Sequence, residues 1–226
     1  MARLGVITGL ASEAGCLDIF PEGERPEVRC AGADSDRAHA LAQALIGEGC
    51  QALLSFGTAG GLTPDIQTGD VICASSVSAP GGQVFETSKA WLEQVQDVLG
   101  QDIRVAAMAG ADTAIATPEA KKELGQATHS AAVDMESHAV AAAARDAGVD
   151  FLVIRAIADP ANRAIPPWVL GNISKQGTPR YGPILAGLTV HPLDLPALLR
   201  LKGDSDRALR SLRGVAGRLG PLFGLP

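Results

Sequence analysis

Short apolar runs alternate with amphipathic stretches along the first 160 residues. Runs rich in β-branched and aliphatic residues predict strands, and apolar residues three or four positions apart predict helices. Strands are expected at residues 3–8, 51–56, 69–77, 102–108, 130–133 and 151–159, and helices at 36–49, 88–99, 117–124 and in the alanine-rich run that ends near 148. Strands separated by helices indicate an α/β protein with a mostly parallel sheet that helices cover on both faces.

Turn and cap residues support these boundaries. Thr117 followed by Pro118 is typical of a helix start, because threonine caps the first amides and proline fits the first turn. The glycine-rich stretch 57–61, GTAGG, is predicted to be a loop after the strand that ends at Phe56.

The pattern changes after Pro160, where prolines become frequent and are followed by a leucine- and arginine-rich stretch. We interpret residues 161–226 as an appended helical section that packs on a core formed by residues 1–160. The prediction is therefore a single domain, 1–226.

Composition narrows the class of protein. Hydrophobic residues make up 46% and charged residues 19% of the chain, which is typical of a soluble globular domain. The four cysteines are far apart in sequence, which favours reduced thiols over a disulfide framework. No run of about 18 apolar residues predicts a membrane span, and the first residues do not resemble a signal peptide. A cytoplasmic protein is expected.

Charge is distributed unevenly along the chain. Residues 161–226 carry nine Lys/Arg and three Asp/Glu, a net +6, whereas residues 1–160 carry 10 and 22, a net −12. A basic section beside an acidic one suggests an anionic partner surface. The leucines at 195–201 and the arginines at 207–218 would suit a solvated helix face or peripheral contact with anionic lipid at the inner membrane surface. The sequence leaves both alternatives open.

In parallel sheets, ligands bind beside the carboxyl ends of strands. The segments to inspect therefore follow Thr8, Phe56, Met108, Val133 and Ile157.

Glu13, Glu136 and Asp159 lie in three of these segments. If they converge, their like charges raise the pKa of at least one carboxyl group, which can then hold a proton near neutral pH. Thr58 lies in the glycine-rich segment, where backbone amides can approach a ligand closely.

Three blocks, SFGTAGGL…GDVI, VDMESHAVA and FLVIRAIAD, resemble the signature blocks of the purine nucleoside phosphorylase and methylthioadenosine/S-adenosylhomocysteine nucleosidase superfamily. The resemblance covers most of residues 3–160. It implies a three-layer αβα nucleoside phosphorylase-like fold, a homo-oligomer (most simply a dimer), and no metal or organic cofactor. The stretch DPANRAIPPWVL…LPALLRL further resembles the hopanoid-associated branch. Its implied substrate is adenosylhopane, a lipid with adenosine at its end.

By this resemblance, Asp159 corresponds to the acid that protonates the purine at N7. Glu136 corresponds to the acid that holds the ribose hydroxyls, Met135 would lie against the sugar, and Glu13 corresponds to the base for the attacking water. Further substrate contacts are expected from Phe56, Thr58, Gly60, Ala114 and Ile115. Ala114 stands where related nucleosidases often have an aromatic residue, so it would stack weakly on the base.

Either water or phosphate could accept the sugar. Phosphorylases of this superfamily bind phosphate with arginines in the first loop and beside the glycine stretch, where this chain has Glu13 and Phe56. Hydrolysis is therefore favoured, because charge complementarity decides which nucleophile is tolerated. Arg25 and Arg29 could still reach in, and the hopanoid branch is usually labelled a phosphorylase. In that case phosphate is a co-substrate.

Other assignments stay open as well. A small-substrate nucleosidase and a non-catalytic adenosine-lipid binding protein are the alternatives to a lipid-cleaving enzyme. GTAGG lacks the dinucleotide-binding spacing, and no nucleic-acid partner is expected. Asp134 is interpreted as a helix N-terminal acid, Arg155 as the partner of an internal carboxylate, and His138 as a hydrogen-bonded histidine, not a metal ligand.

Overall fold

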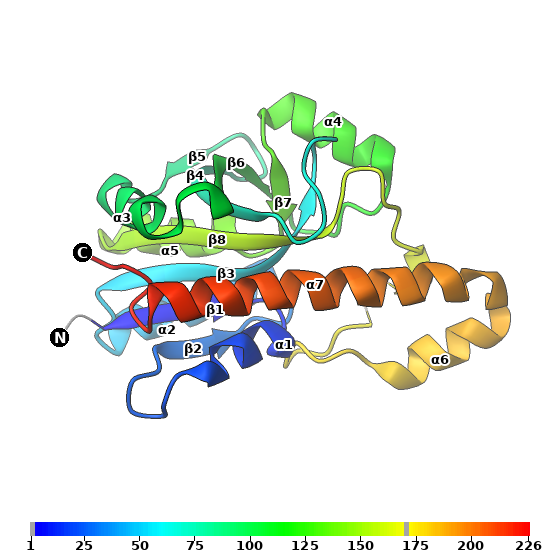
Figure 1. Ribbon diagram of the computed structural model, residues 1–226, viewed down its shortest axis with the longest axis horizontal. Helices are drawn as coiled ribbons and strands as arrows, with labels where there is room; N and C mark the ends of the chain where they lie inside the picture. The colour runs from blue at the N-terminus through cyan, green and yellow to red at the C-terminus, as the bar shows by residue number, and fades with distance from the viewer. Residues whose placement is uncertain (1–2, 170–171) are drawn as a thin grey trace.

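The computed structural model describes residues 3–169 and 172–226, which form one eight-stranded mixed sheet with helices on both sides (Figure 1). The strands are β1 Leu4–Thr8, β2 Glu27–Cys30, β3 Ala52–Gly61, β4 Val71–Ser78, β5 Val84–Glu86, β6 Arg104–Gly110, β7 Ala132–Asp134 and β8 Asp150–Asp159. The helices are α1 Ala11–Ala14, α2 Ser35–Gly47, α3 Lys89–Leu99, α4 Pro118–Thr128, α5 Ser137–Ala147, α6 Tyr181–Val190 and α7 Leu195–Leu219.

The sheet closes on itself around β3. β3 pairs in parallel with β1 and β8 and antiparallel with β7. β8 continues antiparallel to β4, which pairs in parallel with β6, and β6 pairs in parallel with β7. The ring β3–β8–β4–β6–β7 therefore returns to β3, which brings side chains from several parts of the chain together along this strand.

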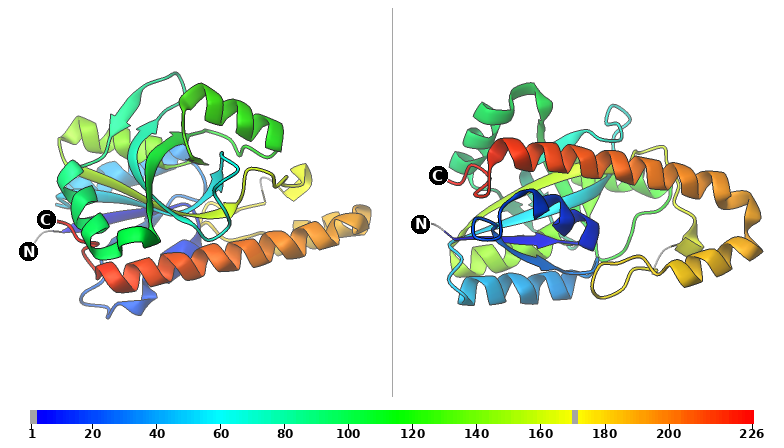
Figure 2. Two further views of the ribbon diagram at one scale, coloured as in Figure 1. Left: turned by 45° about the horizontal axis from the view of Figure 1, so that its top comes forward. Right: turned by 60° about the horizontal axis from the view of Figure 1, so that its bottom comes forward.

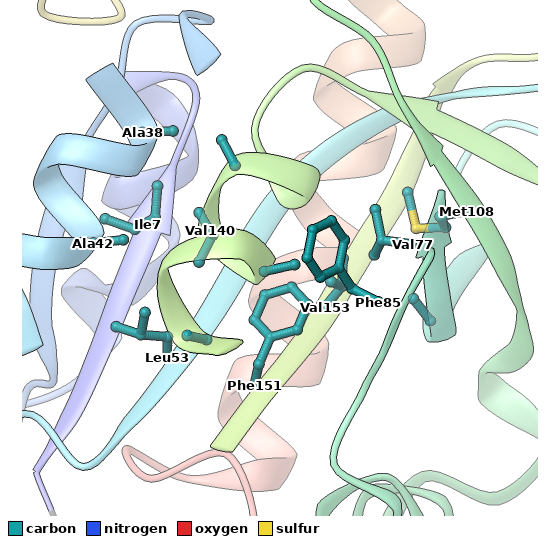
Figure 3. Packing of buried hydrophobic residues seen from close by; sticks show 14 of the residues in the cluster. Ile7, Ala38, Ala42, Leu53, Val77, Phe85, Met108, Val140, Phe151 and Val153 are labelled. Atoms are coloured by element: carbon teal, nitrogen blue, oxygen red, sulfur yellow. The ribbon is translucent and has the colours of Figure 1, made fainter. Parts of the chain in front are cut away.

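Two apolar cores lie on opposite faces of the sheet. On one face α2 and α5 cover Ile7, Leu53, Phe151 and Val153, with Val140 of α5 among them (Figure 3). On the other face α3, α7 and the turn after α1 cover a second cluster that contains Leu54, Phe56, Leu152 and Ile154. The predicted α/β class and its helix–sheet–helix layering are confirmed.

The structure changes one predicted boundary. Residues 57–61, predicted to be a loop, continue β3 as far as Gly61. Glycine is depleted in strands, but here the missing side chain is needed. A Cβ on Gly57 would lie 2.5 Å from both Arg155 Nη1 and Glu13 Oε2. The glycine stretch is therefore a strand that two buried side chains cross closely.

The short strands β2 and β5 have no clear periodicity and were not predicted. The cap of α4 was: Thr117 Oγ1 accepts a hydrogen bond from the Ala120 amide at 3.2 Å, and Pro118 begins the helix.

The C-terminal half of α7 belongs to the second core through Ala208, Leu212, Val215 and Ala216, all of which are buried. Its N-terminal half and α6 form a hairpin that extends beyond the sheet (Figure 2). Among the described residues no single helix is long and apolar enough to cross a membrane. The helices Gly182–Val190 and Pro192–Leu219, which are bent by 113° at the break between them, are together long and apolar enough to do so by length and composition alone.

Candidate active site

Glu13 is held by four hydrogen bonds. The amides of Gly9 and Leu10 each donate to Oε2 at 2.9 Å, and the amide and hydroxyl of Thr58 donate to Oε1 at 2.8 Å. The glutamate is 1% exposed, so the loop after β1 and the middle of β3 fix its position. These four donors use about as many lone-pair sites as a carboxylate has.

Arg155 of β8 lies beside Glu13 and pairs with two further acids. Its Nε is 2.7 Å from Asp134 Oδ2, and its Nη2 is 3.2 Å from Glu136 Oε2. Nη2 also donates to Ser55 Oγ at 2.7 Å. All of these residues are buried. The prediction that Arg155 pairs with an internal carboxylate is confirmed.

Asp134 has a second contact that matches its sequence interpretation. Its Oδ1 accepts hydrogen bonds from the amides of Glu136 and Ser137, at 3.2 and 2.9 Å, where α5 begins. The Ser137 hydroxyl donates to Oδ2. Asp134 therefore satisfies the helix start and neutralises Arg155, which leaves Glu136 as the acid of this pair with the weaker hold on the guanidinium.

One guanidinium thus faces three buried carboxylates: Glu13, Asp134 and Glu136. Burial raises the pKa of Glu136 from its ordinary 4.5 to about 8, Arg155 opposes this rise, and the negative charges of Asp134 and Glu13 add to it. A single positive charge cannot keep three neighbouring acids ionised in a dry site. Glu136 is the acid of this group whose pKa is raised.

Asp159, the third predicted acid, is the last residue of β8. Its Oδ2 accepts a hydrogen bond at 2.6 Å from Nζ of Lys121, a buried residue of α4. Burial raises the pKa of Asp159 above its usual range, and the ammonium group of Lys121 opposes the rise.

Two of the predicted acids lie along β3, and the third lies against the loop after β1. Glu13 lies against Gly57 and Thr58, and a Cβ on Gly60 would lie 3.0 Å from Asp159 Oδ2. Glu136 lies against the loop after β1, since a Cβ on Gly9 would collide with its Oε1. Gly57 and Gly60 are three residues apart, so Glu13 and Asp159 lie about 10 Å apart along the strand. Arg155 lies beside Glu13 and pairs with Glu136.

The other predicted residues are distributed differently. Met135 is half-buried between the two acids of its block, Ala114 is exposed, and Ile115 is partly buried against Leu62 and Val133. Phe56 is fully buried in the second core, edge-on to Phe223 at 5.2 Å between ring centroids. Phe56 is therefore a core residue, and the prediction that it contacts the substrate is wrong.

Lys121 is the residue of the site that the sequence interpretation missed. A usable signal was its position three residues before Leu124, on the side of α4 that faces the protein. His138 matches its interpretation, with Nε2 3.2 Å from Asp112 Oδ1.

The two arginines considered as phosphate ligands point elsewhere. Arg25 pairs with Asp18, and Arg29 Nη2 lies 2.9 Å from Glu48 Oε2, both on the surface.

The segment before α6 borders the loop that holds Glu13. The Ala11 amide donates to the Gly177 carbonyl at 3.0 Å, and the Cys30 thiol lies 3.4 Å from the carbonyls of Gly9 and Gln176. On the opposite side, the Ile165 amide donates to the Ala116 carbonyl at 2.9 Å. The C-terminal section therefore forms part of the rim around the buried acids.

Two surface hollows of the protein contain none of these acids. One, of about 320 Å³, lies between Phe85 and Arg145; the other, of about 330 Å³, lies between the turn at Pro80 and Leu124 of α4. A convergent set of buried charges is the better indicator of a reactive site, so neither hollow is taken as the centre.

Comparison with known proteins gives consistent results. The sequence model of the family described as the phosphorylase superfamily matches residues 30–173. The 5′-methylthioadenosine/S-adenosylhomocysteine nucleosidase of Staphylococcus aureus (strain MRSA252) is 31% identical over 130 residues, which are 49% of this chain and 57% of that protein. The chain thus spans somewhat more than half the length of the curated relatives that it matches.

Solved structures resemble the whole chain at low sequence identity. The futalosine hydrolase of Helicobacter pylori strain 26695 superposes with a TM-score of 0.70 at 15% identity and covers 94% of each chain. A putative 5′-methylthioadenosine/S-adenosylhomocysteine nucleosidase from Francisella philomiragia gives a TM-score of 0.72 at 18% identity, over 97% of this chain and 99% of the other. At these identities the likeness establishes the fold.

Proposed function

Because the chain belongs to the phosphorylase superfamily, we propose that it cleaves the N-glycosidic bond of a 5′-substituted adenosine and transfers the sugar to water. The observation that carries this proposal is that Glu13 and Asp159 lie along Gly57–Gly60 of β3 and that Arg155, beside Glu13, pairs with Glu136. The similarity to nucleosidases supports the reaction class. No metal or organic cofactor enters the proposed reaction.

In the proposed reaction Asp159 donates its proton to N7 of the purine while the bond from N9 to C1′ of the sugar breaks. The purine then leaves as a neutral base, which is a better leaving group than an anion. A water molecule adds to C1′ and gives a proton to Glu13. Because four hydrogen bonds hold the Glu13 carboxylate, the half-buried Thr58 hydroxyl would turn toward this water to free one lone pair.

Glu136 and Met135 suit the sugar. The transition state carries positive charge on the ring, so an acid that holds the ribose hydroxyls binds it more tightly than the ground state. The half-buried methionine offers an apolar surface beside that acid.

Two observations favour water over phosphate: the arginines are paired elsewhere, and the position that phosphate would approach carries a carboxylate. Arg25 and Arg29 pair with surface acids, and Arg155 is committed to Asp134 and Glu136. An incoming phosphate would meet the carboxylate of Glu13, a like charge.

The test is adenine release from methylthioadenosine, S-adenosylhomocysteine and detergent-dispersed adenosylhopane, each with and without phosphate. We expect release without phosphate from at least one of them. The Asp159→Asn variant should lose about 10²–10⁴-fold in rate and still bind the substrate. Release that requires phosphate and yields a sugar 1-phosphate would overturn hydrolysis. Tight binding without release by the parent would favour a non-catalytic binding protein.

The hopanoid-branch resemblance suggests a lipid-linked substrate, and the α6–α7 hairpin supports contact with a lipid surface. Large apolar side chains are exposed there, including Leu185 at 63%, Val190 at 72% and Leu193 at 92%. Between residues 172 and 202 the chain carries four Lys/Arg and one Asp. Exposed apolar residues flanked by cations are typical of an element that binds the surface of an anionic bilayer.

The structure of α7 shifts the predicted contact toward the hairpin. Arg218 pairs with Asp102, and Arg207 packs against Gly69 on the body of the protein. The arginines of the C-terminal half are thus partly engaged in the fold.

Vesicle co-sedimentation tests this contact. We expect the parent to bind phosphatidylglycerol vesicles and not phosphatidylcholine vesicles, and the variant with Leu185→Asp and Leu193→Asp to remain in solution. Val84→Asp and Val98→Asp, which change exposed apolar residues on the body, should have no effect. Equal recovery of the parent and the hairpin variant in the supernatant would contradict the proposal. If light scattering shows that the hairpin variant disrupts an oligomer, the hairpin instead forms the predicted homo-oligomer interface.

A further inference from the structure

α4 directs a lysine into the protein. Within α4, all of which the structure describes, Lys121 is the only fully buried residue. Lysine is almost never fully buried unless its charge is paired, because desolvation of an unpaired ammonium group is strongly unfavourable. The contacts of its Nζ must therefore account for its position.

Those contacts saturate the ammonium group. Nζ lies 2.6 Å from Asp159 Oδ2 and donates to the carbonyls of Arg163 at 2.9 Å and Pro160 at 3.0 Å, with the Asp159 carbonyl at 3.4 Å. A protonated lysine has three donors and no acceptor. The arrangement fits a charged lysine that holds both the Asp159 side chain and the backbone that follows β8.

Two more charged groups face Asp159. Arg163, in the segment after β8, and Asp204, on α7, form an ion pair of 3.1 Å, so their effects on Asp159 largely cancel. Of these three charged groups, Lys121 has the largest effect on the pKa of Asp159. Among the described residues it is also the hydrogen-bond donor to the Asp159 side chain, and it uses Oδ2.

We propose that Lys121 is the positioning residue for the acid of this site: it fixes Asp159 through Oδ2 so that Oδ1 presents its proton to the purine. This inference rests on the proposed function. As the Oδ1–H bond breaks and the N7–H bond forms, the electron pair stays on the carboxylate, and the charge of Lys121 stabilises it. Lys121 keeps its own protons throughout.

The pairing answers a difficulty of a buried acid. Burial alone makes Asp159 hold its proton firmly, so it would be protonated but a weak donor. A neighbouring ammonium group favours the ionised product more than the protonated reactant. Such an interaction is stronger after proton transfer than before it, which is the condition for lowering the barrier.

The test compares Lys121→Met, which removes the charge, with Lys122→Met, which changes the exposed neighbouring lysine of the same helix. In ¹³C NMR titrations the Asp159 carboxyl, assigned by its loss in Asp159→Asn, should titrate roughly one to three pH units higher in Lys121→Met. The alkaline limb of kcat/KM should move upward with it, and kcat should fall about ten- to a hundred-fold. Lys122→Met should match the parent in all three measurements.

Lys121→Gln keeps two donors for the carbonyls and provides a second neutral variant if Lys121→Met does not fold. An Asp159 titration that stays at the parent midpoint in a folded neutral variant would overturn the inference. A lower kcat with an unchanged pH profile would also overturn it and would mark Lys121 as a purely structural pair. The NMR titration needs no turnover, so a parent that releases no adenine would refute the proposed function alone.

Discussion

At the scale of single residues, the site contains more buried carboxyl groups than buried cations. Arg155 lies among Glu13, Asp134 and Glu136, and Lys121 pairs with Asp159. Each cation is placed so that a carboxyl group needed for chemistry is held but not fully neutralised. The residues without a side chain, Gly9 and Gly57, make room for this packing.

The proton on Glu136 should make stability depend on pH. Its pKa is raised from 4.5 to about 8 on folding, so the unfolded chain releases this proton at lower pH than the folded protein. The contribution is fully present below about pH 4.5 and is lost as the pH rises to 8. In urea unfolding, the parent should therefore lose stability across this window relative to Glu136→Gln. The exposed Glu123→Gln serves as control; a parent and a Glu136→Gln variant with parallel pH profiles would refute the assignment.

Gly57→Ala should disturb the site directly. The added Cβ would lie 2.5 Å from Arg155 Nη1 and Glu13 Oε2, and such overpacking costs about 1–3 kcal/mol. The unfolding temperature and the rate of adenine release should both fall. Gly47→Ala, where nothing lies within 4 Å of the new Cβ, should leave both unchanged or slightly raise stability. Normal activity of Gly57→Ala would show that Glu13 and Arg155 can move apart without loss.

At the scale of elements, each strand or helix contributes one part of the site because of where it begins or ends. The start of α5 carries the two acids of its block, the end of β8 carries Asp159, and α4 carries Lys121. α4 is mostly exposed, so local signals such as its cap matter more for it than core packing does.

Thr117→Ala should weaken α4 by removing the acceptor for the Ala120 amide. Loss of such a cap costs about 1 kcal/mol. Denaturant unfolding should report this loss, whereas Thr117→Ser, which keeps the hydroxyl, should retain parental stability. Equal stability of the alanine and serine variants would mean that water replaces the cap without cost.

At the scale of the whole molecule, α7 joins two different surroundings. Its C-terminal half is part of the second core, and its N-terminal half forms the hairpin with α6 (Figure 1). The prediction that residues 161–226 fold with residues 1–160 as one domain can be tested on this helix.

Leu212→Ala should destabilise the entire chain by about 2–5 kcal/mol, because Leu212 is fully buried against the core. Unfolding followed by calorimetry should remain a single transition at a lower temperature. Leu199→Ala, on the same helix and 62% exposed, should change stability little. Two separate transitions, with only one shifted by Leu212→Ala, would indicate that the C-terminal section unfolds independently.

Periodicity and local signals determined much of this protein. The strands at residues 3–8 and 151–159, the helix at 36–49 and the cap at Thr117 follow from side-chain spacing and backbone chemistry, which act between near neighbours. The three motif blocks indicated the family, because each is a short stretch of neighbouring residues. The interpretation of Asp134 as a helix N-terminal acid followed from its place before the alanine-rich run, and the pairing of Arg155 followed from a charged residue in an apolar strand.

Only the tertiary structure decided the rest, because those features depend on residues far apart in sequence. GTAGG forms a strand because it pairs with β8 and β7, and Gly57 lacks a side chain where Arg155 and Glu13 lie. Phe56 lies in the core, where Phe223 packs on it. Lys121 meets Asp159 from 38 residues away. These contacts cannot be inferred from neighbouring residues in the sequence, because they form only when the sheet closes around β3.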